Sequence, residues 1–188
     1  IAAVNADKTE GAVITLNCET DFVGKNEGFV KLATELANLA LNFDDKEAFL
    51  ASDFNGITVA DKLIEQTGVI GEKIEIGSFE RLKGAFVGSY IHAGNKIATL
   101  VALSANVSGG EEAARNVAMQ AAAMSPIALD ENGVDADTIA KEIEIAKDQL
   151  RAEGKPEAML DNIAKGKLNR FFKDNTLVNQ DYINCNRV

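Results

Sequence analysis

A hairpin followed by a helix is the first structure that the hydrophobic pattern predicts. Residues 1–4 form a short apolar run, turn residues follow, and residues 12–18 form a β-rich run. After a polar stretch over 19–28, apolar side chains recur from Phe29 at the three- and four-residue spacing of an amphipathic helix. Because two strands alone are marginally stable, we expect this helix to cover their apolar face.

The same order of elements returns later in the chain. Residues 85–90 and 96–103 are β-rich and flank the turn His92-Ala93-Gly94-Asn95, and a helix follows around Ala114. The offset from the first copy is about 85 residues throughout, so the pattern indicates a duplicated unit. The inner face of the second helix consists of small residues, which predicts a close approach to whatever packs there.

Two capping patterns mark further expected helix starts. Thr58 followed by Asp61 resembles a capping box with Asp in place of Glu, ahead of a short helix that ends near Gly68. Ser108 followed by Glu111 fits the pattern better and predicts the start of the second repeat's helix.

The last third of the sequence has the pattern of two helices. Apolar residues recur in alternating steps of four and three over 139–150, and a second apolar stripe runs over 160–171. Gly154-Lys155-Pro156 separates them, and so short a break requires the helices to run antiparallel. The pattern fits a projecting helical hairpin, and it also fits an ordinary pair of core helices.

These patterns predict an α+β fold of two related subdomains, each with a small antiparallel sheet covered by helices, and a projecting antiparallel helical hairpin. We expect an N-terminal subdomain over 1–80, a C-terminal subdomain that combines 81–134 with 174–188, and the hairpin over 135–173. The chain starts at Ile1 rather than Met, so we expect it to be a fragment of a longer protein.

Charge and composition narrow the classes of function. The chain of 188 residues has 19 Lys and Arg against 29 Asp and Glu, a net charge of −10, which disfavours binding to nucleic acid through its phosphates. Cys18 and Cys185 are too few for a disulfide framework and predict a reduced, cytoplasmic setting. With a single histidine, no zinc site of the usual type is expected, and no motif indicates a cofactor, a metal or a membrane span.

The polar stretch after the second β-rich run holds the first candidate site. Phe22 there is either a core anchor or, because its neighbours are polar, an aromatic side chain presented to a protein partner. Cys18 would need a nearby cation or base to become a nucleophile, and its acidic neighbours instead raise its pKa. His92 lies in a turn without an evident partner, so solvation is its plain interpretation.

Three segments resemble the elongation factor Ts family of guanine-nucleotide exchange factors. The run Asn17 to Asn26, NCETDFVGKN, is similar to one family signature, and Gly88 to Ile97, GSYIHAGNKI, is similar to a second. Gly154-Lys155-Pro156 with Gly166 to Phe171, GKLNRF, resembles the family's coiled-coil hairpin. The three follow one another in the family's order over nearly the whole chain.

The resemblance implies a binding partner and its contact residues. Elongation factor Tu is the implied partner, and a homodimer is left open. A loop with Thr20, Asp21, Phe22 and Val23 is implied to insert between helices of the partner's G domain, near the Mg²⁺ and phosphates of the bound nucleotide. His92 and Gly94 of the second signature are implied to bind beside it.

Further contacts follow from the same resemblance. The second subdomain is implied to bind another domain of the partner, and the hairpin is implied to contact the G domain. Such a factor needs no covalent chemistry, so we do not expect an enzyme. The alternatives are a hydrolase that depends on Cys18, and a scaffold or chaperone-like module that binds without exchanging nucleotide.

Overall fold

The computed structural model describes residues 1–183 and separates into two compact units, Ile1–Ala122 and the segment from Ala123 onward. The predicted α+β class with small antiparallel sheets covered by helices is confirmed. Within the described residues, no helix is both long and apolar enough to span a bilayer. Cys185 lies outside these residues.

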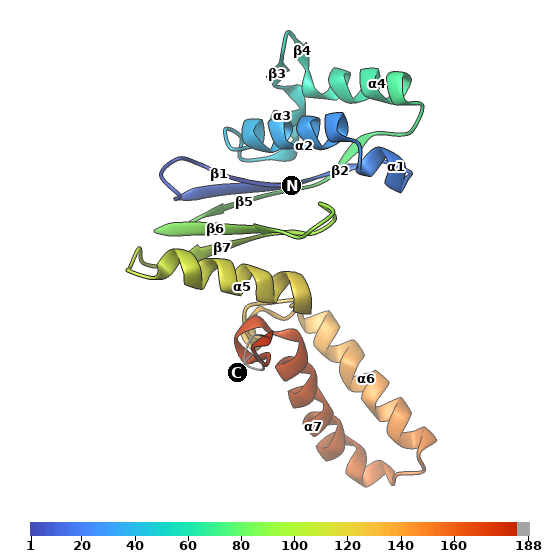
Figure 1. Ribbon diagram of the computed structural model, residues 1–188. Helices are drawn as coiled ribbons and strands as arrows, with labels where there is room; N and C mark the ends of the chain where they lie inside the picture. Colours follow the sequence, from blue (N-terminus) through green and yellow to red (C-terminus); the bar gives the residue numbers. More distant parts are fainter. Residues whose placement is uncertain (184–188) are drawn as a thin grey trace. The chain divides into compact units, whose positions relative to one another are not determined.

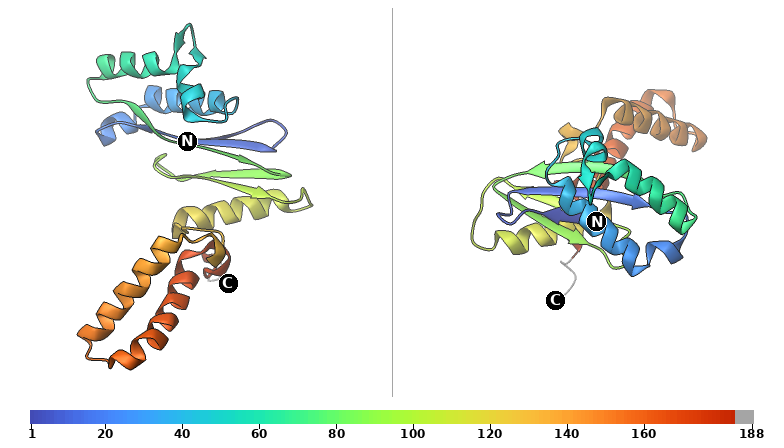
Figure 2. Two further views of the ribbon diagram at one scale, coloured as in Figure 1. Left: turned by 180° about the vertical axis from the view of Figure 1, so that it is seen from behind. Right: turned by 90° about the horizontal axis from the view of Figure 1, so that it is seen from above.

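The first unit is built around two antiparallel sheets. The larger has the order β1-β2-β5, with β1 at Ala2–Val4, β2 at Glu10–Asn17 and β5 at Glu75–Lys83. The smaller pairs β6, Phe86–Ile91, with β7, Ala98–Leu103. The two sheets lie face to face in Figure 1 and, from behind and above, in Figure 2.

Helices cover the outer faces of both sheets (Figure 1). Over the larger sheet lie α2 at Glu27–Ala40, α3 at Lys46–Ala51 and α4 at Val59–Ile70. A short hairpin of β3, Asp53–Phe54, and β4, Ile57–Thr58, connects α3 to α4. The smaller sheet is covered by α5 at Gly110–Met124. The order from α2 to α5 is therefore helix, sheet, sheet, helix.

Bulky side chains fill the space between α2 and the larger sheet. Leu36 on α2 and Phe49 on α3 are fully buried, and Ile14 on β2 contacts the same core. These positions follow from the three- and four-residue spacing of the helix and the alternation of the strand. The first predicted hairpin and helix are thus present as β1, β2 and α2.

Small side chains make the matching contact in the second repeat. Ala114 and Ala118 on α5 are fully buried, and a methyl group at Gly88 on β6 would lie 2.6 Å from the Ala114 side chain. The Thr99 hydroxyl on β7 donates to the carbonyl of Ala118 at 2.8 Å. The close approach predicted from the small residues is confirmed.

The start of α4 agrees with the sequence prediction, and the start of α5 does not. Thr58 caps α4 as predicted, because its hydroxyl accepts from the backbone N–H of Asp61 at 3.0 Å. The start of α5 is later than the Ser108 pattern predicts, because the helix begins at Gly110 after Gly109 turns the chain with φ of 79°. That left-handed backbone conformation favours glycine.

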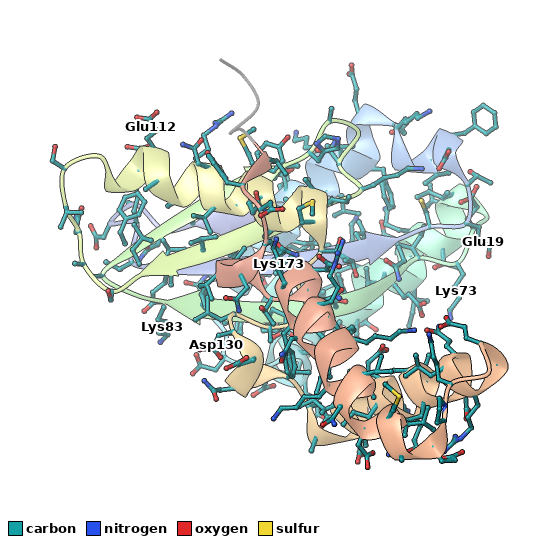
Figure 3. The ribbon with its side chains drawn as sticks, turned by 90° about the horizontal axis from the view of Figure 1, so that it is seen from below. Glu19, Lys73, Lys83, Glu112, Asp130 and Lys173 are labelled. Atoms are coloured by element: carbon teal, nitrogen blue, oxygen red, sulfur yellow. The ribbon has the colours of Figure 1, made fainter. Side chains whose placement is uncertain are left out.

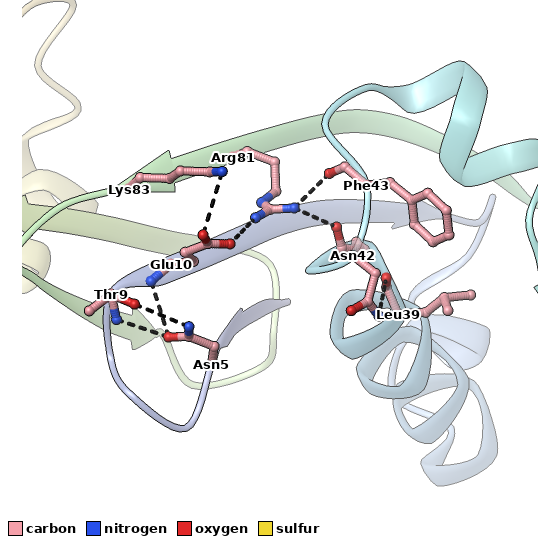
Figure 4. A network of polar contacts seen from close by, with 9 residues as sticks. Asn5, Thr9, Glu10, Leu39, Asn42, Phe43, Arg81 and Lys83 are labelled. Atoms are coloured by element: carbon pink, nitrogen blue, oxygen red, sulfur yellow. Dashed lines mark hydrogen bonds and ion pairs between the residues drawn. The ribbon is translucent and has the colours of Figure 1, made fainter.

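Arg81 on β5 ties the end of α2 to the larger sheet (Figure 4). Its Nη1 donates to the carbonyls of Ala40 at 3.2 Å and Phe43 at 2.6 Å. Its Nη2 donates to Glu10 Oε2 on β2 at 2.7 Å, and Lys83 lies 3.5 Å from the other oxygen of that carboxylate. Arg81 therefore satisfies the last carbonyl of α2 and a carbonyl of the segment after it, and its positive charge at this end of the helix favours the helix dipole.

The second unit contains α6 at Ala136–Ala152 and α7 at Glu157–Asn175, with short 3-10 turns at Glu131–Gly133 and Leu177–Asn179. The helices are antiparallel, because Arg151 near the end of α6 pairs with Glu157 at the start of α7 at 2.8 Å, and Lys147 one turn earlier pairs with Asp161 one turn later at 2.8 Å. The apolar stripes meet between them, where four side chains are buried: Ala146, Leu150, Leu160 and Ala164. The division into 1–80, 81–134 with 174–188, and 135–173 stays a prediction.

Candidate functional site

The polar stretch after β2 folds into a short helix instead of the predicted loop. This helix, α1, spans Asp21–Gly24, and the Thr20 hydroxyl caps it by accepting from the N–H of Val23 at 3.4 Å. Asn26 then caps α2, its side chain accepting from Gly28 and Phe29. Thr and Asn are preferred at such positions, and two caps so close together shape the chain into consecutive helices.

Phe22 lies on the outer side of α1 with 89% of its surface exposed, more than any other large apolar side chain among residues 1–183. The interpretation of Phe22 as a core anchor is therefore wrong. Val23, the next residue, is half-buried and packs against the core under α2. One turn of helix thus anchors itself through Val23 and presents an aromatic ring to solvent.

Glu72, in the connection between α4 and β5, holds the start of α1. Its Oε2 accepts from the backbone N–H groups of Glu19 at 2.9 Å and Thr20 at 3.0 Å, and its Oε1 accepts from the Thr20 hydroxyl at 2.5 Å. Glu19 returns the contact by accepting from the N–H of Lys73 at 3.1 Å. Figure 3 shows the Glu19 and Lys73 side chains on this side of the unit. The hydrogen bond from the Thr20 hydroxyl holds the pKa of Glu72 below its usual range.

An ion pair joins α1 to the turn between β6 and β7. Lys96 Nζ lies 2.9 Å from Asp21 Oδ1, which connects the segments of the two sequence signatures. The hydrogen bond from Lys96, followed by its charge, lowers the pKa of Asp21, and the same contact raises the pKa of Lys96. Both side chains are largely exposed, so this pair is a weak contact that selects one arrangement of two surface segments.

The second signature forms the turn that carries Lys96. His92 is exposed, and its Nδ1 lies 2.9 Å from the Tyr90 hydroxyl. Gly94 and Asn95 have φ of 88° and 58°, the left-handed values that let the chain reverse there. His92 and Gly94 therefore lie in the same turn as the lysine that reaches α1, and their role in binding stays a prediction.

A cleft of about 700 Å³ lies between the two signature segments. Cys18, Thr20 and Asp21 line one side, and residues 94–98 line another. Phe22 does not line it and is exposed to solvent. The cleft is thus a space beside the presented aromatic ring.

Cys18 lacks the surroundings of a nucleophile. Its Sγ donates to the carbonyl of Thr20 at 3.3 Å, and partial burial, followed by the charge of Glu72, raises the pKa of the thiol. A thiol held protonated is a poor nucleophile. Across the part of the chain that the structure describes, no three His, Cys, Asp or Glu side chains gather as metal ligands.

Sequence reasoning missed the two residues that hold α1. Lys96 lies within the second signature segment, but its partner Asp21 is 75 positions away, so no local pattern indicates the pair. Glu72 had no signal at all, because its contacts to Glu19 and Thr20 are 53 and 52 positions away in the sequence. Only the pairing of β5 with β2 brings Glu72 beside the start of α1.

Comparison with known proteins identifies relatives over the whole chain. A family model described as elongation factor TS matches residues 19–187. Elongation factor Ts of Flavobacterium psychrophilum is 82% identical, and the match covers 97% of this chain and 67% of the relative. The protein of the same name from Christiangramia forsetii is 67% identical, and the match covers 100% of this chain and 68% of the relative. The protein of the same name from Porphyromonas gingivalis is 40% identical over 98% and 68%. The chain therefore spans about two thirds of the length of these relatives.

Proposed function

The chain belongs to the elongation factor Ts family, and from this premise we propose that it promotes GDP release from elongation factor Tu by inserting α1 near the Mg²⁺ and phosphates. Asp21 and Phe22 make the contact in this proposal, with Thr20 and Val23 as its frame. His92 and Gly94 bind the partner beside them. Because translation factors work in the cytoplasm, we expect the protein there; pairing of two copies stays a prediction.

The exposure of Phe22 is the observation that carries this proposal. A solvated phenyl ring at 89% exposure is costly to leave in water and gains about 1.5–3 kcal/mol when a partner buries it. Aromatic side chains, Phe among them, are also enriched at protein interfaces relative to the rest of the surface. The short α1 with its anchored Val23 carries this ring.

The size of the required effect shows that Phe22 does not act alone. Weakening GDP binding by about 10⁴-fold needs about 5.5 kcal/mol of coupling between factor and nucleotide. Burial of one phenyl ring supplies at most about half of that. The rest has to come from Asp21, near the charge of Mg²⁺, and from contacts of the second signature. Coupling is reciprocal, so incoming nucleotide expels the factor by the same ratio.

The direct test is release of fluorescent GDP from elongation factor Tu in a stopped-flow instrument. We expect Phe22→Ala to slow release about 10- to 100-fold at subsaturating factor, as the loss of 1.5–3 kcal/mol requires. Its unfolding transition should match that of the parent, because the ring contributes little to the core. Ile64→Ala, which truncates a 71% exposed side chain on α4, is the matched control and should keep the parental rate. Parental exchange by Phe22→Ala would refute the assignment of α1.

A substitution of Asp21 tests whether this residue disturbs the nucleotide site or only contributes to binding of the partner. We expect Asp21→Ala to slow GDP release more than it weakens the complex with nucleotide-free elongation factor Tu. The reason is that a carboxylate near Mg²⁺ competes for cations and hydrogen-bond donors while release takes place. Equal losses in release and in affinity would show that Asp21 only docks.

The same assay decides between the alternatives. A binding module without exchange activity would bind elongation factor Tu and leave GDP release unchanged. A hydrolase that depends on Cys18 would lose its activity on Cys18→Ser, whereas we expect this variant to exchange nucleotide like the parent. The raised pKa of the Cys18 thiol supports that expectation.

A further inference from the structure

We propose that Glu72 is a positioning residue for nucleotide exchange, which fixes the direction in which α1 presents Phe22 without itself contacting the partner. This inference rests on the proposed function, because it assumes that Phe22 is the contact. It concerns a residue outside both sequence signatures, in the connection after α4.

A carboxylate matches the geometry at the start of α1. Three donors converge there, the N–H groups of Glu19 and Thr20 on one oxygen of Glu72 and the Thr20 hydroxyl on the other. An ionised carboxylate accepts on both oxygens and donates nothing, so it satisfies all three at once. Charge-assisted hydrogen bonds of this kind are shorter and stronger than neutral ones.

Glu72 also sets the cap of α1 through the Thr20 hydroxyl. When the hydroxyl proton points to Glu72, its oxygen keeps a lone pair for the N–H of Val23, which is the capping bond. The two bonds therefore form a chain from Glu72 through Thr20 to Val23. Removing Glu72 frees the hydroxyl to rotate and leaves the cap without its orienting partner.

A helix as short as α1 needs such external support. It has 4 residues, and a single turn is unstable alone because nucleation fixes several residues for one hydrogen bond. Val23 is its half-buried anchor, and Lys96 contributes an exposed ion pair to Asp21. Glu72 is the group that fixes the backbone itself, and the return bond from Lys73 to Glu19 joins the two segments at a second point.

Because α1 is already fixed, little conformational entropy is lost when a partner buries the Phe22 ring. Loss of Glu72 should therefore weaken binding to elongation factor Tu more than it slows GDP release from the complex. We expect Glu72→Ala to raise the factor concentration for half-maximal GDP release about tenfold, with the maximal rate within about twofold of the parent. Glu72→Gln should stay within about threefold, because its amide oxygen still accepts from Glu19 and Thr20. Glu75→Ala is the control, since Glu75 pairs with Lys73 on the same segment and has no bond to α1.

Two further measurements distinguish positioning from other roles. Amide hydrogen exchange over residues 19–24 should quicken at least tenfold in Glu72→Ala and stay unchanged over α2 and α4. In a background that carries both Phe22→Ala and Asp21→Ala, Glu72→Ala should add almost no further slowing, because Glu72 acts through the side chains that α1 presents. A full additional tenfold loss in that background would mean that Glu72 meets the partner directly, and would overturn the proposal.

The outcomes also separate this inference from the proposed function. If Phe22→Ala slows release and Glu72→Ala behaves like the parent, the positioning role is refuted and the function stands. If Phe22→Ala exchanges normally, the function as proposed fails, and this inference fails with it.

Discussion

The two hairpin-and-helix repeats of the first unit share a topology and differ in what joins strand to helix. In the first, β2 leads into α1 and then α2, with bulky residues such as Leu36 in the contact. In the second, β7 leads through the exposed segment 104–109 into α5, whose contact with β6 relies on Gly88 and Ala114. In the first repeat an additional turn of helix, α1, lies between strand and helix, whereas in the second the small-residue contact brings helix and strand close together.

Each repeat also carries its candidate contacts in a different place. The first presents Phe22 on the connection between strand and helix, and the second presents His92 on the turn between its strands. Lys96 in that turn pairs with Asp21, so the two unlike connections meet at one side of the unit. The two repeats thus contribute different connections, α1 from the first and the β6–β7 turn from the second, to one surface of the unit.

The largest expected effect is in the bulky contact of the first repeat. Leu36→Ala removes a fully buried side chain and should lower the free energy of unfolding by about 2–5 kcal/mol through lost burial and a residual cavity. Urea denaturation followed by circular dichroism measures it. Ile64→Ala on the exposed face of α4 should change stability by less than about 0.5 kcal/mol. A loss below about 1 kcal/mol for Leu36→Ala would mean that the first repeat is not held by bulky packing.

The small-residue contact between α5 and β6 should lose stability when a side chain is enlarged, whereas the bulky contact loses stability when one is truncated. Gly88→Ala places a methyl group 2.6 Å from the Ala114 side chain and should cost about 1–3 kcal/mol of overpacking. Gly68→Ala is the matched control, because Gly68 lies inside α4 with open space around it and should gain about 0.5–1 kcal/mol of helix propensity. Equal effects of the two substitutions in the same denaturation assay would remove the distinction between the repeats.

The smallest effect concerns the ion pair that joins the repeats. Lys96→Met should slow GDP release by less than about threefold, and the difference should shrink further at high salt, because exposed pairs are weak and screened. The lowered pKa of Asp21 means that the pair is intact above about pH 4 and is lost as the pH falls through that lowered value. An NMR titration of the Asp21 carboxyl should therefore show a higher midpoint in Lys96→Met than in the parent, and an unchanged midpoint would contradict the pairing.

The sequence predicted the local elements of the fold well because their causes are local. The stripe from Phe29, the Thr58 cap and the break at Gly154 each depend on neighbours within about one or two turns of helix. The small-residue face of α5 even predicted the closeness of its packing, which the contact of Gly88 with Ala114 confirms.

The features that the sequence does not predict are the short helix α1, the contacts of Glu72 and the exposure of Phe22. They depend on residues far apart in the sequence or on weak local preferences. The sequence predicts a loop for the polar stretch, whereas the structure has α1 there, capped by Thr20, whose hydroxyl also donates to Glu72. The position of Glu72 follows from the pairing of β5 with β2, which no local pattern reports. For the same reason the exposure of Phe22 could be stated only as one of two interpretations.

The attachment of Arg81 gives α2 a mechanical role. The helix has 14 residues, about 21 Å at 1.5 Å per residue, and one end follows α1 while the other is bonded to Arg81. A load applied along the axis of α2 reaches a helix end that Arg81 holds against the larger sheet. The load is then carried into the strands instead of tilting the helix.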